Sequence, residues 1–187
     1  MATLTLAQSD ADLQGILALQ RQNLRTVLTT DILNSQGFLT IEHDLPLLRR
    51  MNDAAPSIIA KDGAEVVGYS LTMLPSFRDD IPMLTAMFDL LDNLTYQNRL
   101  LGDYAYVVMG QICVAKRFRG QGLFDGLYGK FREELAGTYA LAVTEVAVRN
   151  RRSQRAHERV GFRKLHTYFD PSNGEDWDVV VWDWGEQ

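Results

Sequence analysis

The 187-residue chain has 46% hydrophobic and 23% charged residues and a formal net charge of −5. This is the composition of an ordinary globular protein, and it excludes a disordered chain. The acidic balance argues against a general nucleic-acid binder, which would usually be basic. The length suffices for one domain with a substantial core, so we expect a single domain over residues 1–187 and no nucleic-acid partner.

Membrane and disulfide signals are both missing from the sequence. No apolar run approaches the ~20 residues that span a bilayer. The opening stretch MATLTLAQSDADL lacks the charged start and apolar middle of a signal peptide. The only cysteine, Cys113, lies within an apolar run and has no partner for an internal disulfide. We expect no membrane association, a cytoplasmic location, and a small buried residue at Cys113.

The N-terminal part predicts a strand, two helices and a β-hairpin. TLTLA alternates like a short strand, and Asp10 is a candidate N-cap for a helix whose apolar residues recur at helical spacing as far as Leu28. LPLLRRMND predicts a second, shorter helix. Two β-rich runs between Ser57 and Leu74 flank Asp62-Gly63, a dipeptide typical of a tight hairpin turn.

The stretch from Pro75 to Asp103 is harder to interpret. PMLTAMFDLLDNL has a helical pattern, whereas its surroundings are typical of loop. Two interpretations stay open for this segment: a flap, or an interface. A homodimer is therefore one of the assemblies that we consider.

The second half alternates strands and helices. YAYVVMGQICVA predicts a central strand buried on both faces, followed by a helix from Leu123 to Leu135. LAVTEVAV predicts a second buried strand, and NRRSQRAHERVGF a helix with Asn150 as its N-cap and Gly161 at its end. RKLHTYF and WDVVVWDW predict two final strands. The order predicts an α/β fold with a mixed sheet of about six to seven strands flanked by helices.

The stretch VAKRFRGQGLFDGLYGKF places a cationic glycine turn between a strand and a helix. The first four amides of a helix have no partner within it, and the helix dipole adds roughly half a positive charge there. Glycine lets an anion approach the main chain closely. Lys116, Arg117 and Arg119 add full charges, and Arg149, Arg151, Arg152 and Arg155 form a second cationic stretch. The pattern favours a small anionic ligand, although glycines in such a turn also suit an ordinary tight turn.

Two familiar phosphate loops do not fit the turn. A mononucleotide P-loop needs a Lys-Ser/Thr pair after its last glycine, and here Leu123 and Phe124 follow Gly122. The dinucleotide fingerprint Gly-x-Gly-x-x-Gly belongs in the first βα turn of a domain. Here Gly126 falls one position too late, and the turn lies far from the N-terminus.

The run Arg117-Phe118-Arg119-Gly120-Gln121-Gly122 resembles the R/Q-x-x-G-x-G/A signature of the GNAT superfamily of acyl-CoA-dependent N-acyltransferases. In that family the loop holds the coenzyme A pyrophosphate. The family often shows, after the next strand, N-x-x-A/S with a tyrosine seven residues beyond the Asn and Gly-Phe eleven and twelve beyond. The matching positions here are Asn150, Ser153, His157 and Gly161-Phe162. Two motifs in one register, from about Val107 to Phe162, make the resemblance specific.

The resemblance implies acetyl-CoA as co-substrate, bound where the two central parallel strands splay. Main-chain groups of the strand before the turn would hold the pantetheine arm and the thioester carbonyl, the turn would hold the pyrophosphate, and the second helix would contact pantetheine. The implied cofactor-binding residues are Ile112, Cys113, Val114, Arg117, Phe118, Arg119, Gly120, Gln121, Gly122, Leu123, Asn150 and Ser153.

Two residues are implied for catalysis. His157 stands where the family usually has a tyrosine thought to protonate the departing thiolate. An imidazole with a pKa of about 6.5 can protonate the thiolate of a thiol whose pKa is about 8.5. An alkylammonium acceptor must lose a proton before attack, and Glu145 is the candidate general base. Other candidates that would rim an acceptor site are Glu42, Asp44, Asp103 and Tyr168.

The sequence thus predicts an N-acetyltransferase that moves an acetyl group from acetyl-CoA to a primary amine of a small molecule or peptide by direct nucleophilic attack. The alternative is a non-catalytic acyl-CoA-binding sensor or interaction module of the same fold. His43 and His166 are isolated in the sequence and form no metal-ligand spacing, so we expect no metal. Trp177, Trp182 and Trp184 are expected in the core or at a dimer surface.

Overall fold

The computed structural model describes residues 2–24, 39, 41–171 and 174–185. Its strands form a seven-stranded sheet in the order β1-β2-β3-β6-β7-β9-β8 and a separate two-stranded sheet, β4-β5. Strands β6 and β7 run parallel, and β1-β2, β2-β3, β7-β9 and β9-β8 are antiparallel pairs. The mixed sheet with flanking helices confirms the predicted fold class. The elements are β1 Thr3–Leu6, α1 Asp10–Arg21, α3 Leu45–Ala54, β2 Ile58–Asp62, β3 Glu65–Met73, α4 Thr85–Asn93, β4 Thr95–Tyr96, β5 Arg99–Leu100, β6 Tyr106–Val114, α5 Leu123–Leu135, β7 Leu141–Ala147, α6 Arg151–Val160, β8 Arg163–Asp170 and β9 Glu175–Asp183.

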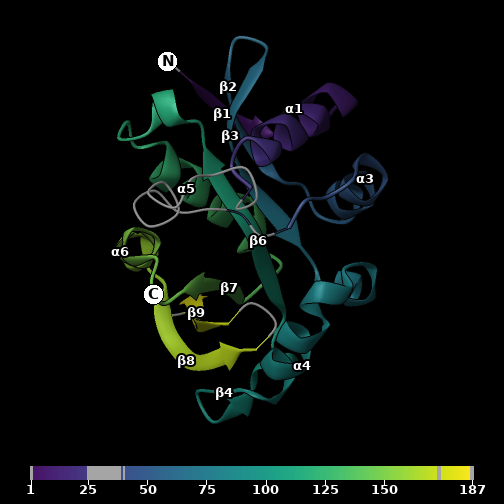
Figure 1. The fold of residues 1–187 in the computed structure, drawn as a ribbon. Coiled ribbons are helices and arrows are strands. Elements are labelled where there is room, and N and C mark those ends of the chain that lie inside the picture. The colour runs from purple at the N-terminus through teal and green to yellow at the C-terminus, as the bar shows by residue number, and fades with distance from the viewer. Residues whose placement is uncertain (1, 25–38, 40, 172–173, 186–187) are drawn as a thin grey trace. The chain divides into compact units, whose positions relative to one another are not determined.

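The chain divides into two compact units, one of Met1–Thr72 with Met109–Glu134 and one of Met73–Val108 with Leu135–Gln187. In the first unit, α1 and α3 lie on one side of the strands and α5 on the other (Figure 1). The helices pack tightly: a Cβ at Gly15 of α1 would lie 2.6 Å from Val66 Cγ2, and one at Gly126 of α5 would lie 2.9 Å from Leu4 Cδ1. Glycine at these two positions therefore lets both helices approach the sheet.

Helix α1 differs from its prediction at both ends. Ser9, not Asp10, is the N-cap: its hydroxyl accepts from Asp12 N–H at 3.2 Å, and the Asp12 carboxylate accepts from Ser9 N–H at 3.1 Å. This capping box satisfies two donors at once, which a cap by Asp10 would not. The helix ends at Arg21, and Leu24 instead pairs with Leu39 in an isolated parallel bridge. Residues 25–28 of the predicted helix lie outside the described residues.

The hairpin and the second helix confirm their predictions. Strands β2 and β3 pair around a turn in which Gly63 has a φ of +60°, the left-handed backbone that favours glycine. Helix α3 begins after Asp44, whose carboxylate accepts from Leu47 N–H at 2.8 Å. Asp44 therefore serves as a helix cap.

The second unit begins with the segment whose surroundings were predicted as loop. The predicted helix is present as α4, but Pro75–Asp80, Pro82–Leu84 and Leu101–Asp103 form 3-10 helices, and β4 and β5 form a short hairpin. Gln97 and Asn98 make its two-residue turn with φ of 45° and 63°. Because asparagine tolerates this backbone, the Gln-Asn pair was the only local signal for the hairpin.

Strands β7, β9 and β8 form the rest of the second unit. Helix α6 begins after Asn150 and ends at Gly161, whose φ is 123°, as the sequence predicted. Gln154 of α6 donates to Asp178 of β9 at 3.0 Å, and Asp178 lies opposite Val146 of β7. Because side chains alternate along a strand, α6 covers the face of Val146 and Asp178, whereas Glu145 belongs to the opposite face.

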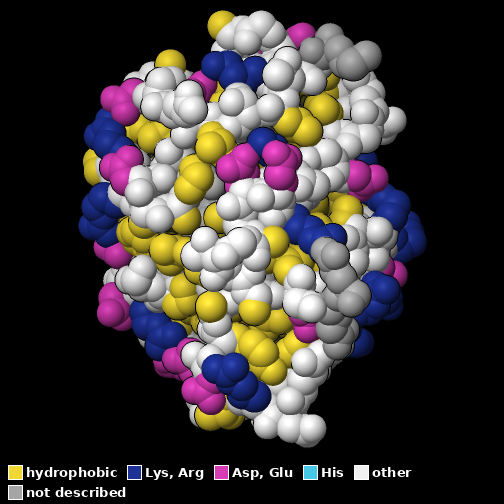
Figure 2. Space-filling view, turned by 180° about the vertical axis from the view of Figure 1, so that it is seen from behind, with side chains coloured by type: hydrophobic (Ala, Val, Ile, Leu, Met, Phe, Trp, Pro, Cys, Tyr) yellow, Lys and Arg dark blue, Asp and Glu magenta, His cyan; other side chains and the backbone are white. Residues whose placement is uncertain are grey.

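Surface charges of both signs are interspersed on the face of the molecule drawn in Figure 2. Ion pairs near the surface include the exposed Arg49–Asp10 pair at 2.7 Å and the half-buried Lys130–Glu134 pair at 2.6 Å. Such pairs stabilise a fold only weakly, by ~0.2–1 kcal/mol each. Among the described residues, no helix has the length and apolar character needed to cross a membrane.

Candidate functional site

The glycine turn between β6 and α5 leaves its main chain open. Gly120 and Gly122 have φ of +75° and +77°, and a Cβ built at either would meet no atom within 4 Å. The hydrogen-bond ladder of α5 begins with Gly126 N–H donating to Gly122 O at 3.0 Å. The preceding amides therefore lie at the positive end of the helix dipole, beside glycines whose lack of a side chain leaves room for an anion.

Side chains hold this turn in place. Arg119 donates from Nε to Val114 O at 2.9 Å and from Nη2 to Asn23 Oδ1 at 3.0 Å. Gln121 donates to Arg117 O at 3.0 Å. Hydrogen bonds at both ends of the Lys116–Gly122 segment thus fix the backbone that presents the glycines.

The three cations before the glycines have different roles. Arg119 is committed to the contacts just described, and Arg117 forms an ion pair with Glu65 while its guanidinium lies 5.0 Å from the centroid of the Phe118 ring. Lys116 is exposed. The sequence alone did not distinguish these three cations. In the structure, Arg119 stabilises the turn, whereas Arg117 and Lys116 are surface charges.

Strand β6 carries the three residues predicted to offer main-chain groups. The Val114 carbonyl accepts from Arg119, and the next amide, Ala115 N–H, donates to Val67 O at 2.8 Å. Cys113 is buried, and burial raises the pKa of its thiol to about 12. The thiol is therefore not a nucleophile at neutral pH, and the prediction of a small buried cysteine is confirmed.

A buried polar network lies against β6, and no residue spacing along the chain indicates it. Gln20 of α1 donates to His43 Nδ1 at 2.9 Å and to Gln111 Oε1 at 2.6 Å, and its own Oε1 accepts from His43 N–H at 2.8 Å. Tyr69 donates to Gln111 at 3.1 Å, and Gln111 donates to Ile41 O at 2.7 Å. Burial lowers the pKa of His43 to about 4, so the ring is neutral and accepts through Nδ1. His43, isolated in the sequence, thus ties its segment to α1 and β6.

On α6, the three predicted residues lie together. Asn150 Oδ1 accepts from Ser153 N–H at 3.1 Å, so Asn150 caps the helix. His157 is buried, and its Nδ1 donates to Ser153 O at 2.8 Å, since a carbonyl can only accept. Burial lowers the pKa of His157 to about 4. At neutral pH the ring is therefore uncharged and carries its proton on Nδ1.

Glu145 lies on β7, on the face opposite α6. The residue is half-buried, and desolvation raises the pKa of its carboxyl to about 7, while a hydrogen bond from Tyr168 lowers it and the charge of Asp170 raises it further. The atom Oε1 is buried and has no hydrogen-bond partner within the described part of the chain. A carboxyl with a pKa near neutrality in a solvent-poor setting is suited to proton transfer at physiological pH.

The other acidic candidates serve the fold. Glu42 pairs with Arg21 at 2.9 Å, and Asp44 caps α3. Asp103 accepts a hydrogen bond from Arg99 through its main-chain carbonyl. Tyr168 donates a hydrogen bond to the Glu145 carboxyl. Of the C-terminal tryptophans, Trp184 is buried and the Trp182 ring contacts the rings of Phe162 and Trp184, whereas Trp177 is half-buried.

No cluster of three or more His, Cys, Asp or Glu side chains that could hold a metal ion occurs among the residues that the structure describes. The open glycine turn is suited to anion binding and the Glu145 carboxyl to acid-base work.

Comparison with known proteins adds three solved structures of the same fold. The ribosomal-protein-S18-alanine N-acetyltransferase from Escherichia coli has a TM-score of 0.64 at 13% identity, covering 100% of this chain and 96% of that one. The NatC complex bound to Gag peptide and CoA has a TM-score of 0.67 at 13% sequence identity. The match covers 97% of this chain and 98% of that one. The protein yncA from Salmonella typhimurium, solved with its cofactor acetyl-CoA, has a TM-score of 0.66 at 15% sequence identity. The match covers 100% of this chain and 96% of that one. At these identities the likeness concerns the fold.

Sequence comparison gives two further results. Residues 28–162 match the model of the acetyltransferase (GNAT) family. No curated protein matches the chain. The matched range includes the glycine turn, Glu145 and helix α6.

Proposed function

Because the chain belongs to the GNAT family of acetyltransferases, we propose that it transfers an acetyl group from acetyl-CoA to a primary amine by direct nucleophilic attack. The observation that carries this proposal is Glu145, a half-buried residue whose carboxyl has its pKa raised to about 7 by desolvation. An amine acceptor is mostly an ammonium ion at neutral pH and must lose a proton before it can attack. A base with a pKa near the working pH accomplishes this best.

The open glycine turn supports acetyl-CoA as the co-substrate. The diphosphate of coenzyme A carries the negative charge that a helix N-terminus with bare glycines and nearby cations attracts. Gly120, Gly122 and the main chain of Gln121 and Leu123 are our proposed contacts, with Lys116 adding charge from the surface. A cytoplasmic location, which we also propose, gives access to the acetyl-CoA pool.

In the proposed reaction, Glu145 accepts a proton from the ammonium ion, directly or through a water molecule. The nitrogen lone pair then forms a bond to the thioester carbonyl carbon. As the C–S bond breaks, the nitrogen loses its second proton and the departing sulfur takes up a proton, which gives an amide and coenzyme A thiol. A main-chain N–H of β6, near Ile112 or Val114, would stabilise the oxygen that becomes negative. Such a donor contributes roughly 3–4 kcal/mol in oxyanion holes.

Helix α6 and Glu145 lie on opposite faces of the β7-β9-β8 sheet. His157, on α6, stays our predicted acid for the thiolate. Because the neutral ring carries its proton on Nδ1 and donates it to Ser153 O, this role requires the ring to gain a second proton first.

The test compares binding with turnover. Calorimetric titration with acetyl-CoA and with coenzyme A measures the cofactor site, and thiol release from acetyl-CoA is then followed at pH 8 over a panel of amines. The panel includes polyamines, amino acid amides and peptides with free N-termini; a peptide arm is supported by the NatC relative, which was solved with a peptide. We expect turnover with at least one amine.

Two other results would reject the proposal. Tight binding of coenzyme A without turnover of any amine would favour the non-catalytic sensor or interaction module. Failure to bind coenzyme A at millimolar concentration would also remove the proposed cofactor site. The variant Glu145→Gln separates cofactor binding from turnover, since it should bind acetyl-CoA normally and release little thiol.

A further inference from the structure

Glu145 and Tyr168 come from strands that are not neighbours in the sheet. Glu145 of β7 lies opposite Val179 of β9, and Val179 lies opposite His166 of β8. One row further along the sheet, Trp177 of β9 lies between Ala147 and Tyr168. Residues directly opposite one another project to the same face, as do residues two apart on one strand. Tyr168 therefore shares the face of Glu145, one row along and two strands away.

The small side chain of Ala147 makes this contact sterically feasible. Ala147 occupies the β7 position of the Tyr168 row, so no bulky β7 side chain stands beside Glu145 on that side. The long Tyr168 side chain can then lean across β9 toward β7. Its hydroxyl donates a hydrogen bond to the Glu145 carboxyl, while Oε1 of that carboxyl is buried without a partner within the described residues.

We propose that Tyr168 is the positioning residue of Glu145: its hydroxyl holds one carboxylate oxygen and leaves Oε1 to take the proton of the acceptor amine. The inference rests on the proposed acetyl transfer for its catalytic meaning, but the contact itself belongs to the fold. A carboxylate that accepts one hydrogen bond keeps its orientation and uses one of its two oxygens for that bond. The free oxygen is then the proton acceptor.

Tyr168 acts as a donor and not as a second base. Burial and the neighbouring carboxylates Glu145 and Asp170 raise the pKa of its hydroxyl well above the ordinary value. The phenol therefore keeps its proton throughout the pH range in which Glu145 titrates. A proton relay through Tyr168 would require the phenolate, which these surroundings disfavour.

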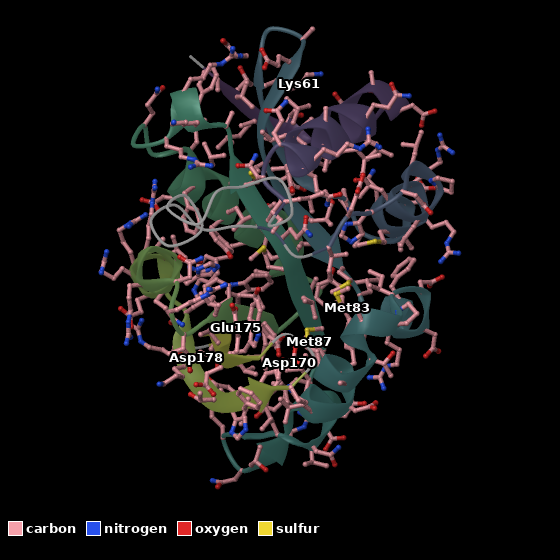
Figure 3. The ribbon with its side chains drawn as sticks, viewed as in Figure 1. Lys61, Met83, Met87, Asp170, Glu175 and Asp178 are labelled. Carbon is pink, nitrogen blue, oxygen red and sulfur yellow. The ribbon has the colours of Figure 1, made fainter. Side chains whose placement is uncertain are left out.

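The titratable groups on this face come from all three strands. On β8 they are His166, Tyr168 and Asp170; on β9 the residue nearest Glu145 is the apolar Val179, and Glu175 lies opposite Asp170. Asp170 and Glu175 lie on this neighbouring strand pair (Figure 3). Glu175 forms an ion pair with Arg149, which follows β7. The Glu175 charge is thus compensated, which leaves Tyr168 and Asp170 as the opposing influences on Glu145.

The experiment titrates Glu145 directly. The protein is labelled with glutamate carrying 13C at the carboxyl carbon, the Glu145 resonance is assigned with Glu145→Gln, and its midpoint is followed from pH 5 to pH 9. Tyr168→Phe should raise the midpoint by roughly half a unit to one unit, the value of one hydrogen bond. Asp170→Asn should lower the midpoint, because it removes a negative charge.

A matched control distinguishes the contact from a general loss of packing. Tyr104→Phe removes another tyrosine hydroxyl of the same unit, which donates to Tyr96 O at 3.0 Å, and should leave the Glu145 midpoint in place. In the enzyme assay, Tyr168→Phe should lower kcat roughly threefold to tenfold and shift the rise of kcat/KM to higher pH. The KM for acetyl-CoA should stay unchanged, because the proposed cofactor contacts do not include Tyr168.

An unmoved or lowered midpoint in folded Tyr168→Phe would overturn the inference. A raised midpoint with no effect on kcat, in a protein that acetylates amines, would also overturn it, because Glu145 would then be oriented by other groups. A raised midpoint in a protein that turns over no amine would leave the Tyr168–Glu145 contact established and reject only the proposed function.

Discussion

The glycine turn and the Glu145 face present two different kinds of site. At the turn, the proposed ligand-binding groups are main-chain amides at an exposed surface. Gly120 and Gly122 contribute by having no side chain that would block an anion. On the Glu145 face, the pKa of one half-buried carboxyl depends on desolvation and on Tyr168 and Asp170 from another strand. The comparison indicates that binding an anion needs only a local backbone conformation, whereas tuning a base needs contacts between distant parts of the chain.

The largest expected effect tests the second site. Glu145→Gln should lower kcat by roughly a hundredfold or more, the usual contribution of a general base, with acetyl-CoA affinity unchanged. Steady-state thiol release and calorimetry check the two quantities. Glu134→Gln, a change of the same kind on the exposed side of α5, is the control and should keep wild-type kcat. Equal loss in both variants would contradict the assignment.

The pH dependence of Glu145 sharpens the same site. Its pKa is raised from an ordinary 4.5 to about 7, so the folded protein favours the protonated carboxyl. Its contribution to stability is present below about pH 4.5 and is lost as the pH rises through 7. Activity has the opposite trend, since the base must be ionised. We expect Glu145→Gln to melt at a higher temperature than wild type at pH 8 and at a similar temperature at pH 4.5.

The next effect tests the first site. Gly122→Ala places a Cβ where an anion would approach and forces an alanine into a left-handed backbone, at a cost of about 1–2 kcal/mol. Gly63→Ala imposes the same backbone strain in the β2-β3 turn, where the space around the Cβ is also open. Both variants should lose similar thermal stability, but only Gly122→Ala should weaken coenzyme A binding, roughly tenfold. Equal affinity in both variants would separate the turn from the cofactor.

His157 occupies a position of the family motif, yet it lies buried on α6. If it is the acid, His157→Phe lowers kcat at least tenfold and leaves acetyl-CoA affinity nearly unchanged. Its pKa is lowered from 6.5 to about 4, so the wild-type protein loses stability as the pH falls from 6.5 through 4. The variant should lose less over that range. Denaturant unfolding at pH 7 and pH 4.5 measures the difference, and an unchanged kcat would exclude the acid role.

The smallest effect concerns the surface charges of the turn. Lys116→Ala should weaken coenzyme A binding about twofold at low ionic strength, and the difference should vanish at ~0.5 M salt, because exposed charges are screened. Arg119→Ala should instead lower the free energy of unfolding, since Arg119 braces Val114 and Asn23. Titrations at two salt concentrations, together with unfolding curves, distinguish these roles.

The sequence by itself determined the features that depend on local conformation. The order of strands and helices, the Asp62-Gly63 hairpin, the Asn150 and Gly161 ends of α6 and the glycine turn all follow from capping, periodicity and backbone preferences over a few residues. Family membership followed too, because its two motifs are set by spacing along the chain.

The tertiary structure alone decided which side chains meet. No spacing joins Gln20 to His43 and Gln111, or Tyr168 to Glu145, because hydrogen bonds across a sheet depend on register and not on distance along the chain. Burial likewise set the ionisation of Glu145 and His157, through desolvation that a sequence does not display. The proposed anion site thus depends on the backbone of one short turn, and the pKa of the proposed base depends on the sheet that surrounds it.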